Sequence, residues 1–136
     1  MAFANTIVSG LLRSPLHRIM SGSTDLIRYT GQRSGREIVT PTQYARFGDD
    51  VIILVGRPDT KTWWRNFTTD RDIDVLIQRT RLPMTGRAVI GADEPDTVTP
   101  LLNAYLARFP RAGRALGGDA GGSLAQRSVI VWCRPR

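Results

Sequence analysis

The sequence predicts one mainly β domain of the α+β type. We expect an antiparallel barrel of about six strands, with one helix at the start of the chain and another late in it. Between residues 25 and 91, short apolar segments alternate with turns that contain glycine or proline, which is typical of antiparallel strands. Apolar residues at helical spacing occur before and after this region. The length of 136 residues suits a single domain, which we place at 1–136, with a helical N-terminal segment at 1–22.

The first half of the chain contains a helical segment and three strands. Phe3, Ile7 and Leu11 repeat at helical spacing, and Ser14-Pro15 can begin a second short helical turn. A later apolar run shows no alternation, which predicts a strand that is buried on both faces. The predicted strands occupy residues 25–30, about 36–47 and 51–56, and Gly48-Asp49 forms the turn between the last two.

The second half adds a hairpin, a helix and a final strand. A loop over residues 57–67 ends in the first turn of a helix. The late helix, residues 96–109, has Thr99 as its predicted cap and Pro100 in its first turn. The glycine-rich stretch after this helix does not follow a strand, so it predicts a connection rather than a nucleotide-binding loop. The hairpin is predicted over 73–80 and 84–91, the connection over 113–123 and the last strand over 128–133.

Charge and cysteine content narrow the classes of function. The formal net charge is +7, and Lys61 is the only lysine. This charge admits an anionic small molecule, an anionic membrane surface or nucleic acid as a partner. Nucleic acid is not expected, because no aromatic-rich strand signature or recognition helix is evident. Cys133 is the single cysteine, which excludes an internal disulfide, and the single histidine, His17, argues against a metal site. Without a signal peptide or a long apolar run, the chain is expected in the cytoplasm.

Two cationic segments give the strongest functional signal. Gly31–Arg36 reads Gly-Gln-Arg-Ser-Gly-Arg, and Lys61–Phe67 reads Lys-Thr-Trp-Trp-Arg-Asn-Phe. Arginine side chains and glycine-flanked backbone amides suit a phosphate, whereas tryptophan faces suit a flat ring. Taken alone, Trp63 and Trp64 would be read as one core and one rim aromatic residue. Together with the cations, they predict a pocket for a planar ligand that carries phosphate.

Hairpin geometry predicts that the two cationic segments meet. If Gly48-Asp49 is a two-residue turn, regular pairing outward from it places Pro41 opposite Gly56 and Arg36 opposite Lys61. Cations that crowd together repel one another unless an anion lies between them. The alternative is that the long side chains spread into water. The cations gathered by this register are Arg33, Arg36, Arg57, Lys61 and Arg65.

Four short motifs occur in a fixed order along the chain. In order and spacing they resemble the deazaflavin-dependent nitroreductase and quinone reductase family of actinobacteria. That family's pattern combines a T-G-x-x-S-G loop, a T-P pair, a G-D hairpin and a W-[YW]-x-N segment. The resemblance covers about half the chain, roughly residues 25–91, and Val129–Trp132 suits the family's closing strand. The motifs are Tyr29–Arg36, Thr40-Pro41, Gly48-Asp49 and Trp63–Phe67.

The resemblance implies a split, flavin-binding type of β-barrel that holds the 8-hydroxy-5-deazaflavin coenzyme F-420, with FMN less expected. It implies an oxidoreductase that passes a hydride from the reduced coenzyme to a small electron-poor acceptor: a quinone, an enone or a nitro compound. The first loop would bind the phosphate and the acidic tail of the coenzyme. Trp63 and Asn66 would lie beside the tail and the deazaflavin ring.

The predicted binding set combines the resemblance with the hairpin argument. Thr40-Pro41 marks a strand edge or a bulge, because proline cannot donate to the ladder, and edge protection explains it as well as a ligand does. No catalytic residue is assigned, and the proton for the product could come from water, Tyr44 or Tyr105. The cofactor-binding set is Gln32, Arg33, Ser34, Gly35, Arg36, Thr40, Pro41, Gly56, Arg57, Lys61, Trp63, Trp64 and Asn66.

Two departures from the family pattern support an alternative function. The loop at 56–62 is shorter than the family's, and no tyrosine follows Pro110, where well-studied nitroreductases carry them. The alternative is a non-catalytic binder of a lipid, a fatty acid or a flavin-like ligand on the same barrel. In either case, residues 1–20 could contact the inner face of the cell membrane, and two copies of the chain could pair as a homodimer.

Overall fold

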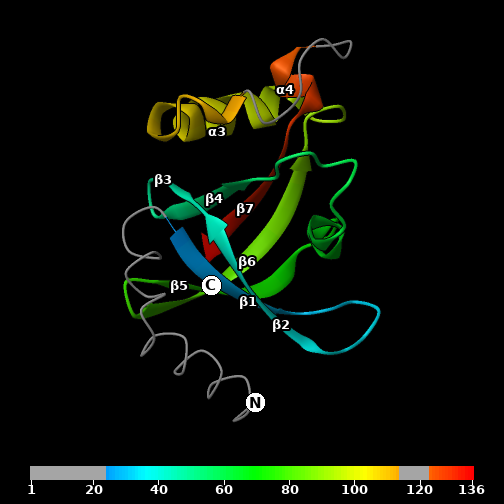
Figure 1. The fold of residues 1–136 in the computed structure, drawn as a ribbon, viewed down its shortest axis with the longest axis vertical. Helices are drawn as coiled ribbons and strands as arrows, with labels where there is room; N and C mark the ends of the chain where they lie inside the picture. Colours follow the sequence, from blue (N-terminus) through cyan, green and yellow to red (C-terminus); the bar gives the residue numbers. More distant parts are fainter. Residues whose placement is uncertain (1–23, 114–122) are drawn as a thin grey trace.

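The computed structural model describes residues 24–113 and 123–136. Within them the fold is mainly β, with one long helix late in the chain (Figure 1). The predicted helical segment at 1–22 and most of the glycine-rich connection lie outside the described residues. The elements are β1 (Thr24–Thr30), β2 (Glu37–Gln43), β3 (Ala45–Phe47), β4 (Asp50–Leu54), the 3-10 helix η1 (Trp63–Phe67), β5 (Arg71–Ile77), β6 (Thr80–Ile90), α3 (Pro95–Arg108), α4 (Leu124–Arg127) and β7 (Val129–Pro135).

The strands form one antiparallel sheet that curls into a half-barrel. Its order is β2-β1-β5-β6-β7-β4-β3, so the described part of the chain contains seven strands rather than about six. The two outer strands, β2 and β3, stand at opposite ends of this order, yet only Tyr44 separates them in the chain. The sheet must therefore bend round until its two ends come close, and Figure 1 shows β2 crossing toward β3 and β4.

The predicted strand at 36–47 is in fact two strands, and this overturns the predicted register. The turn at Gly48-Asp49 is confirmed, because Phe47 pairs with Asp50. Counting back from the turn, regular pairing with β4 ends at Ala45, because the buried Tyr44 interrupts the strand before it. Beyond it, β2 pairs with β1, and Pro41 lies opposite Leu26 rather than Gly56. The predicted pairing of Arg36 with Lys61 is wrong for the same reason. Pro41 does lie on an edge strand, as its missing N–H predicts.

Three local features differ from the predictions. The β5–β6 turn falls at Gln78 and Arg79, which adopt positive φ angles of 48° and 70° without any glycine. Helix α3 begins at Pro95, so Thr99 does not cap it: the Thr99 hydroxyl donates to the Pro95 carbonyl at 2.7 Å, and Pro100 lies inside the helix. The short helix α4 was not predicted, although Ser123 and Gln126 form a capping box at its start.

Two apolar clusters occupy the two faces of the sheet. Along β4, Val51 and Ile53 join the cluster inside the half-barrel, and Ile52 joins the one beneath α3. This confirms that the 51–56 run is covered on both faces. The inner cluster includes Phe67 from η1, and the outer cluster includes Leu101 and other residues of α3. Helix η1 is thereby anchored in the mouth of the half-barrel, where the cationic segments lie.

Candidate functional site

The first cationic loop is a fixed turn between β1 and β2. The Gly31 N–H donates to the Arg36 carbonyl at 2.8 Å, and the Gly35 N–H donates to the Gly31 carbonyl at 2.9 Å. Gly35 has a φ of +70°, which favours glycine. A Cβ on the buried Gly31 would lie 2.7 Å from Ser34 Oγ, so glycine leaves the Ser34 side chain in place. The turn leaves Arg33 exposed at its tip.

The second cationic loop is held by its own tryptophan. Trp64 is buried in the inner cluster, and its Nε1–H donates to the Pro58 carbonyl at 3.0 Å. The Arg57 carbonyl accepts from the Lys61 N–H at 3.2 Å, which closes the loop between them. Trp63 is only half-buried, and its ring lies edge-on to Phe67 with centroids 6.3 Å apart. Of the two tryptophans, one is therefore a core anchor and the other is a rim residue.

A side-chain hydrogen bond joins the two loops. The Gln32 N–H donates to Asn66 Oδ1 at 2.8 Å, and Asn66 Nδ2 donates to the Trp63 carbonyl at 2.8 Å. The predicted meeting of the loops is therefore confirmed, although Asn66 makes it rather than a pairing of Arg36 with Lys61. Both loops reach this point because the β1–β2 turn and η1 lie at the same end of the half-barrel (Figure 1).

The loops enclose a cavity of about 350 Å³, which we call the basic cavity. Arg33 lines it from the first loop and Arg65 from the second. Arg65 also lies over the Trp64 ring, 5.5 Å from its centroid, so its guanidinium is supported by an anchored side chain. Two guanidinium groups, one from each loop, provide donors for a phosphate or carboxylate. The cavity is lined by Gly31, Gln32, Arg33, Ser34, Ile38, Thr62, Arg65 and Asn66.

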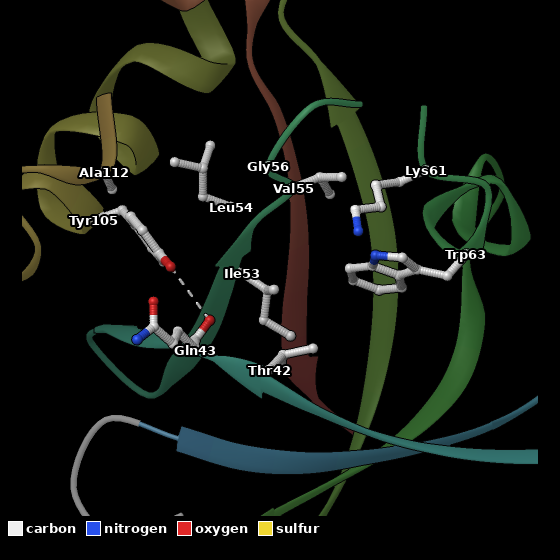
Figure 2. Close-up of a pocket in the computed structure, with 10 residues that line it drawn as sticks. All are labelled: Thr42, Gln43, Ile53, Leu54, Val55, Gly56, Lys61, Trp63, Tyr105 and Ala112. Atoms are coloured by element: carbon white, nitrogen blue, oxygen red, sulfur yellow. Dashed lines mark hydrogen bonds between the residues drawn. The ribbon is translucent and has the colours of Figure 1, made fainter. Parts of the chain in front are cut away.

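A second cavity of about 280 Å³, which we call the apolar cavity, lies on the other side of the same loop. Figure 2 shows Lys61 and Trp63 extending into it from the loop, with Tyr105 reaching in from α3. The Tyr105 hydroxyl donates to the Gln43 carbonyl at 3.4 Å. Lys61 and Trp63 line this cavity and Thr62 lines the basic one, so the cavities are neighbours. The apolar cavity is lined by Thr42, Gln43, Ile53, Leu54, Val55, Gly56, Lys61, Trp63, Tyr105 and Ala112.

Burial sets the protonation of two groups near the apolar cavity. Asp25 is fully buried, and burial raises the pKa of its carboxyl to about 7 from an ordinary value of 3.8. The Thr42 hydroxyl donates to Asp25 Oδ1. Burial also raises the pKa of Tyr105 to about 12, so this hydroxyl keeps its proton at neutral pH.

The structure separates the predicted binding residues into three groups. Four line the basic cavity: Gln32, Arg33, Ser34 and Asn66. Three line the apolar cavity: Gly56, Lys61 and Trp63. The other six, Gly35, Arg36, Thr40, Pro41, Arg57 and Trp64, line neither cavity, although Gly35, Arg57 and Trp64 shape the loops.

Sequence reasoning missed several lining residues. Thr42 and Ile53 come from β2 and β4, and they reach the cavity only because the sheet bends at Tyr44. Arg65 was counted among the gathered cations but was left out of the binding set. Within residues 24–113 and 123–136, no group of three His, Cys, Asp or Glu side chains could hold a metal ion. No helix in these ranges has the length and apolar character to span a membrane.

Comparison with known proteins assigns the chain to a family. The chain matches the F420H(2)-dependent quinone reductase family over residues 13–115 and belongs to that family. It is therefore an enzyme that transfers a hydride from reduced coenzyme F-420 to an acceptor. No curated protein matches it.

Several solved structures share the fold of this chain. One, an F420-H2 dependent reductase (FDR-A), has a TM-score of 0.55 at 16% identity, over 84% of this chain and 96% of that one. A protein of unknown function from Agrobacterium tumefaciens, Atu2129, has a TM-score of 0.60 at 20% identity, over 92% of this chain and 56% of that one. A domain-swapped dimer has a TM-score of 0.55 at 14% identity, over 93% and 99%.

Proposed function

We propose that the two cavities divide coenzyme F-420 between them. The acidic, phosphate-bearing tail lies in the basic cavity, and the deazaflavin ring lies in the apolar cavity beside Trp63. The observation that carries this assignment is the alternation along Lys61–Trp63, where neighbouring residues line one cavity and then the other. One elongated ligand with an anionic end and a flat apolar end fits such a pair of sites.

The residues in the basic cavity suit the anionic end. Arg33 and Arg65 approach from different loops, so their guanidinium groups can hold a phosphate between them. The Ser34 hydroxyl is exposed on the same turn and can donate as well. The Gln32 N–H is already bonded to Asn66, so this bond positions the loop and leaves ligand binding to the side chains.

The residues in the apolar cavity suit the ring and the acceptor. When bound, the reduced coenzyme supplies a hydride from its C5 carbon. Trp63, Ile53 and Val55 provide apolar walls that exclude water from the reacting atoms. The ammonium group of Lys61 is the one charged group among the lining residues, and it can donate a hydrogen bond to an oxygen of the ring or of the acceptor. We infer that the acceptor is a quinone, with enones and nitro compounds as the other candidates.

Coenzyme titration tests this assignment. Arg33→Ala and Lys61→Ala should each weaken coenzyme binding by about 1–3 kcal/mol, because each removes a charged hydrogen-bond donor from a cavity. Quenching of coenzyme fluorescence measures the affinity, and oxidation of the reduced coenzyme by a short-chain benzoquinone measures turnover.

Arg46→Ala is the matched control for this titration, because Arg46 is an exposed arginine on β3 that lines neither cavity. It changes the net charge by the same amount. If Arg46→Ala loses as much coenzyme affinity as Arg33→Ala and Lys61→Ala do, the coenzyme is held by the net positive charge of the protein rather than by the cavities.

We also propose that the chain acts as a single domain in the cytoplasm, at the inner face of the cell membrane. The net charge of +7 and the apolar spacing over residues 3–12 support contact of residues 1–20 with anionic lipid. Co-sedimentation with vesicles that contain anionic lipid tests this, and equal sedimentation of a chain lacking residues 1–12 would contradict it.

We further propose that two copies of the chain form a homodimer, which the similar fold of a domain-swapped dimer supports. Light scattering coupled to size-exclusion chromatography would measure the molar mass and so reveal the dimer.

A further inference from the structure

A buried carboxyl group lies one side chain away from the apolar cavity. Asp25 is the second residue of β1, and its side chain has no solvent exposure. Its neighbour across the ladder is Thr42 of β2, whose hydroxyl donates to Asp25 Oδ1. The other oxygen, Oδ2, has no hydrogen-bond partner among residues 24–113 and 123–136. A fully buried carboxyl with one unpartnered oxygen is costly, so it calls for an explanation beyond packing.

Thr42 connects this carboxyl to the place where we expect the reaction. Thr42 lines the apolar cavity, and Figure 2 shows it below Ile53 on the side of the cavity that faces β2. A hydroxyl group can donate one hydrogen bond and accept others. When Asp25 is ionised, the Thr42 hydroxyl donates to it. When Asp25 is protonated, it can donate to Thr42, and the Thr42 hydroxyl can then donate to another acceptor.

The groups around Asp25 favour a neutral, proton-holding state. Tyr44 at the β2–β3 junction, Tyr105 on α3 and Cys133 on β7 all feel the charge of Asp25, and burial raises the pKa of each, so each keeps its proton. No cation in the described part of the chain forms a salt bridge with Asp25. Burial raises the pKa of Asp25 to about 7, against hydrogen bonds from the Thr42 hydroxyl and from the backbone of Asp25 and Thr42 that lower it. The more distant charges near these groups are Arg46, Asp50 and Arg108.

We propose that Asp25 holds the proton that completes reduction of the acceptor and delivers it through Thr42. This inference rests on the proposed place of the ring and the acceptor in the apolar cavity. The hydride that the bound coenzyme would supply brings two electrons, and it would leave the acceptor short of one proton. The O–H bond of Asp25 then breaks, Thr42 takes that proton, and the Thr42 hydroxyl gives its own proton to the acceptor oxygen. Asp25 is left as a carboxylate and regains a proton from water by the same path after the product leaves.

In this scheme Thr42 touches the acceptor, and Asp25 is a positioning residue that acts through it. The pH profile of kcat tests the scheme. For the unmodified enzyme, kcat should fall about tenfold per pH unit above pH 7, because only protonated Asp25 can supply the proton. Asp25→Asn should lower kcat and remove this fall. Thr42→Val should do the same with little change in KM, and Thr42→Ser should restore both the rate and the profile.

A second measurement needs neither the coenzyme nor activity. In difference infrared spectra of the coenzyme-free protein, a carboxylic C=O band should disappear as the pH rises through about 7. The band should be missing in Asp25→Asn and should shift in Thr42→Val, which loses the hydrogen bond. If no such band titrates near neutral pH, the inference is overturned.

The kinetic outcomes separate the two proposals. If the protein binds and oxidises the reduced coenzyme while Asp25→Asn, Thr42→Val and the unmodified enzyme share one pH profile, the proton path is wrong and the proposed function stands. If the coenzyme does not bind at all, both proposals fail, and the fluorescence titration reveals that case directly.

Discussion

At the scale of single residues, Asp25 links the stability of the protein to pH. Its pKa is raised from 3.8 to about 7 in the folded protein, so folding favours the protonated carboxyl. Below pH 4 the carboxyl is protonated in both states and contributes no pH dependence. Between pH 4 and 7 the unfolded chain ionises first, so the free energy of unfolding falls as the pH rises. Above pH 7 the loss is complete.

Asp25→Asn should abolish the fall in the free energy of unfolding between pH 4 and 7, because an amide stays neutral over that range. The loss in the unmodified protein is on the order of 4 kcal/mol, at about 1.4 kcal/mol per pH unit. Urea unfolding of both proteins at pH 4.5 and pH 8 measures it. Asp59→Asn, a change at an exposed loop carboxyl, is the control and should behave as the unmodified protein does. A parallel pH dependence in Asp25→Asn would show that Asp25 ionises normally.

At the scale of elements, the site depends on how the β1–β2 turn and η1 are held together. Asn66 makes both connections, to Gln32 in the turn and to Trp63 in its own helix. Trp64 and Phe67 anchor η1 from below by burial in the inner cluster. Burial of the two aromatic side chains holds η1 against the sheet, and the Asn66 amide holds the β1–β2 turn against η1.

Asn66→Ala should therefore lower the free energy of unfolding by about 1–2 kcal/mol. It should also weaken coenzyme binding by the folded protein, because the turn that carries Arg33 is no longer held to η1. Thr68→Ala is the matched control, because Thr68 is exposed and its hydroxyl donates only to the Arg65 carbonyl at the end of the same helix. Chemical unfolding and fluorescence titration give the two quantities. Equal affinity in Asn66→Ala and Thr68→Ala would show that the turn holds its place without Asn66.

The same scale explains how much of the fold and site could be predicted from the sequence. Apolar spacing and the Gly48-Asp49 turn predicted most strands, and loop composition predicted the two segments that meet. The bend at Tyr44 could not be predicted, because a buried aromatic residue in a strand looks the same whether the strand continues or breaks. Thr42 reaches the cavity through that bend, and Asp25 was predicted only as the first residue of the strand at 25–30, so neither residue was assigned to the site.

At the scale of the whole molecule, the last strand is central to the sheet. β7 pairs with β6 along its whole length and with β4 over Val51–Leu54. Its residues Val131 and Cys133 are fully buried in the inner cluster, and Ile130 is fully buried in the outer one. β7 therefore joins the two halves of the half-barrel.

A chain that ends at Arg127 should lose cooperative unfolding, because β4 and β6 then have no strand between them. Thermal unfolding followed by circular dichroism measures this. Arg136→Ala is the control: it removes only ion pairs with Asp72 and Asp74 and should cost about 0–1 kcal/mol. A sharp transition in the shortened chain would mean that the remaining strands form a stable sheet alone.

The position of β7 also has a consequence for biosynthesis. Because β7 follows β4 and β6 in the chain, it leaves the ribosome after them, and both strands have an unpaired edge until it emerges. During that interval the nascent chain exposes two strand edges that can pair with a neighbouring copy, and slow synthesis between β6 and β7 would lengthen the exposure.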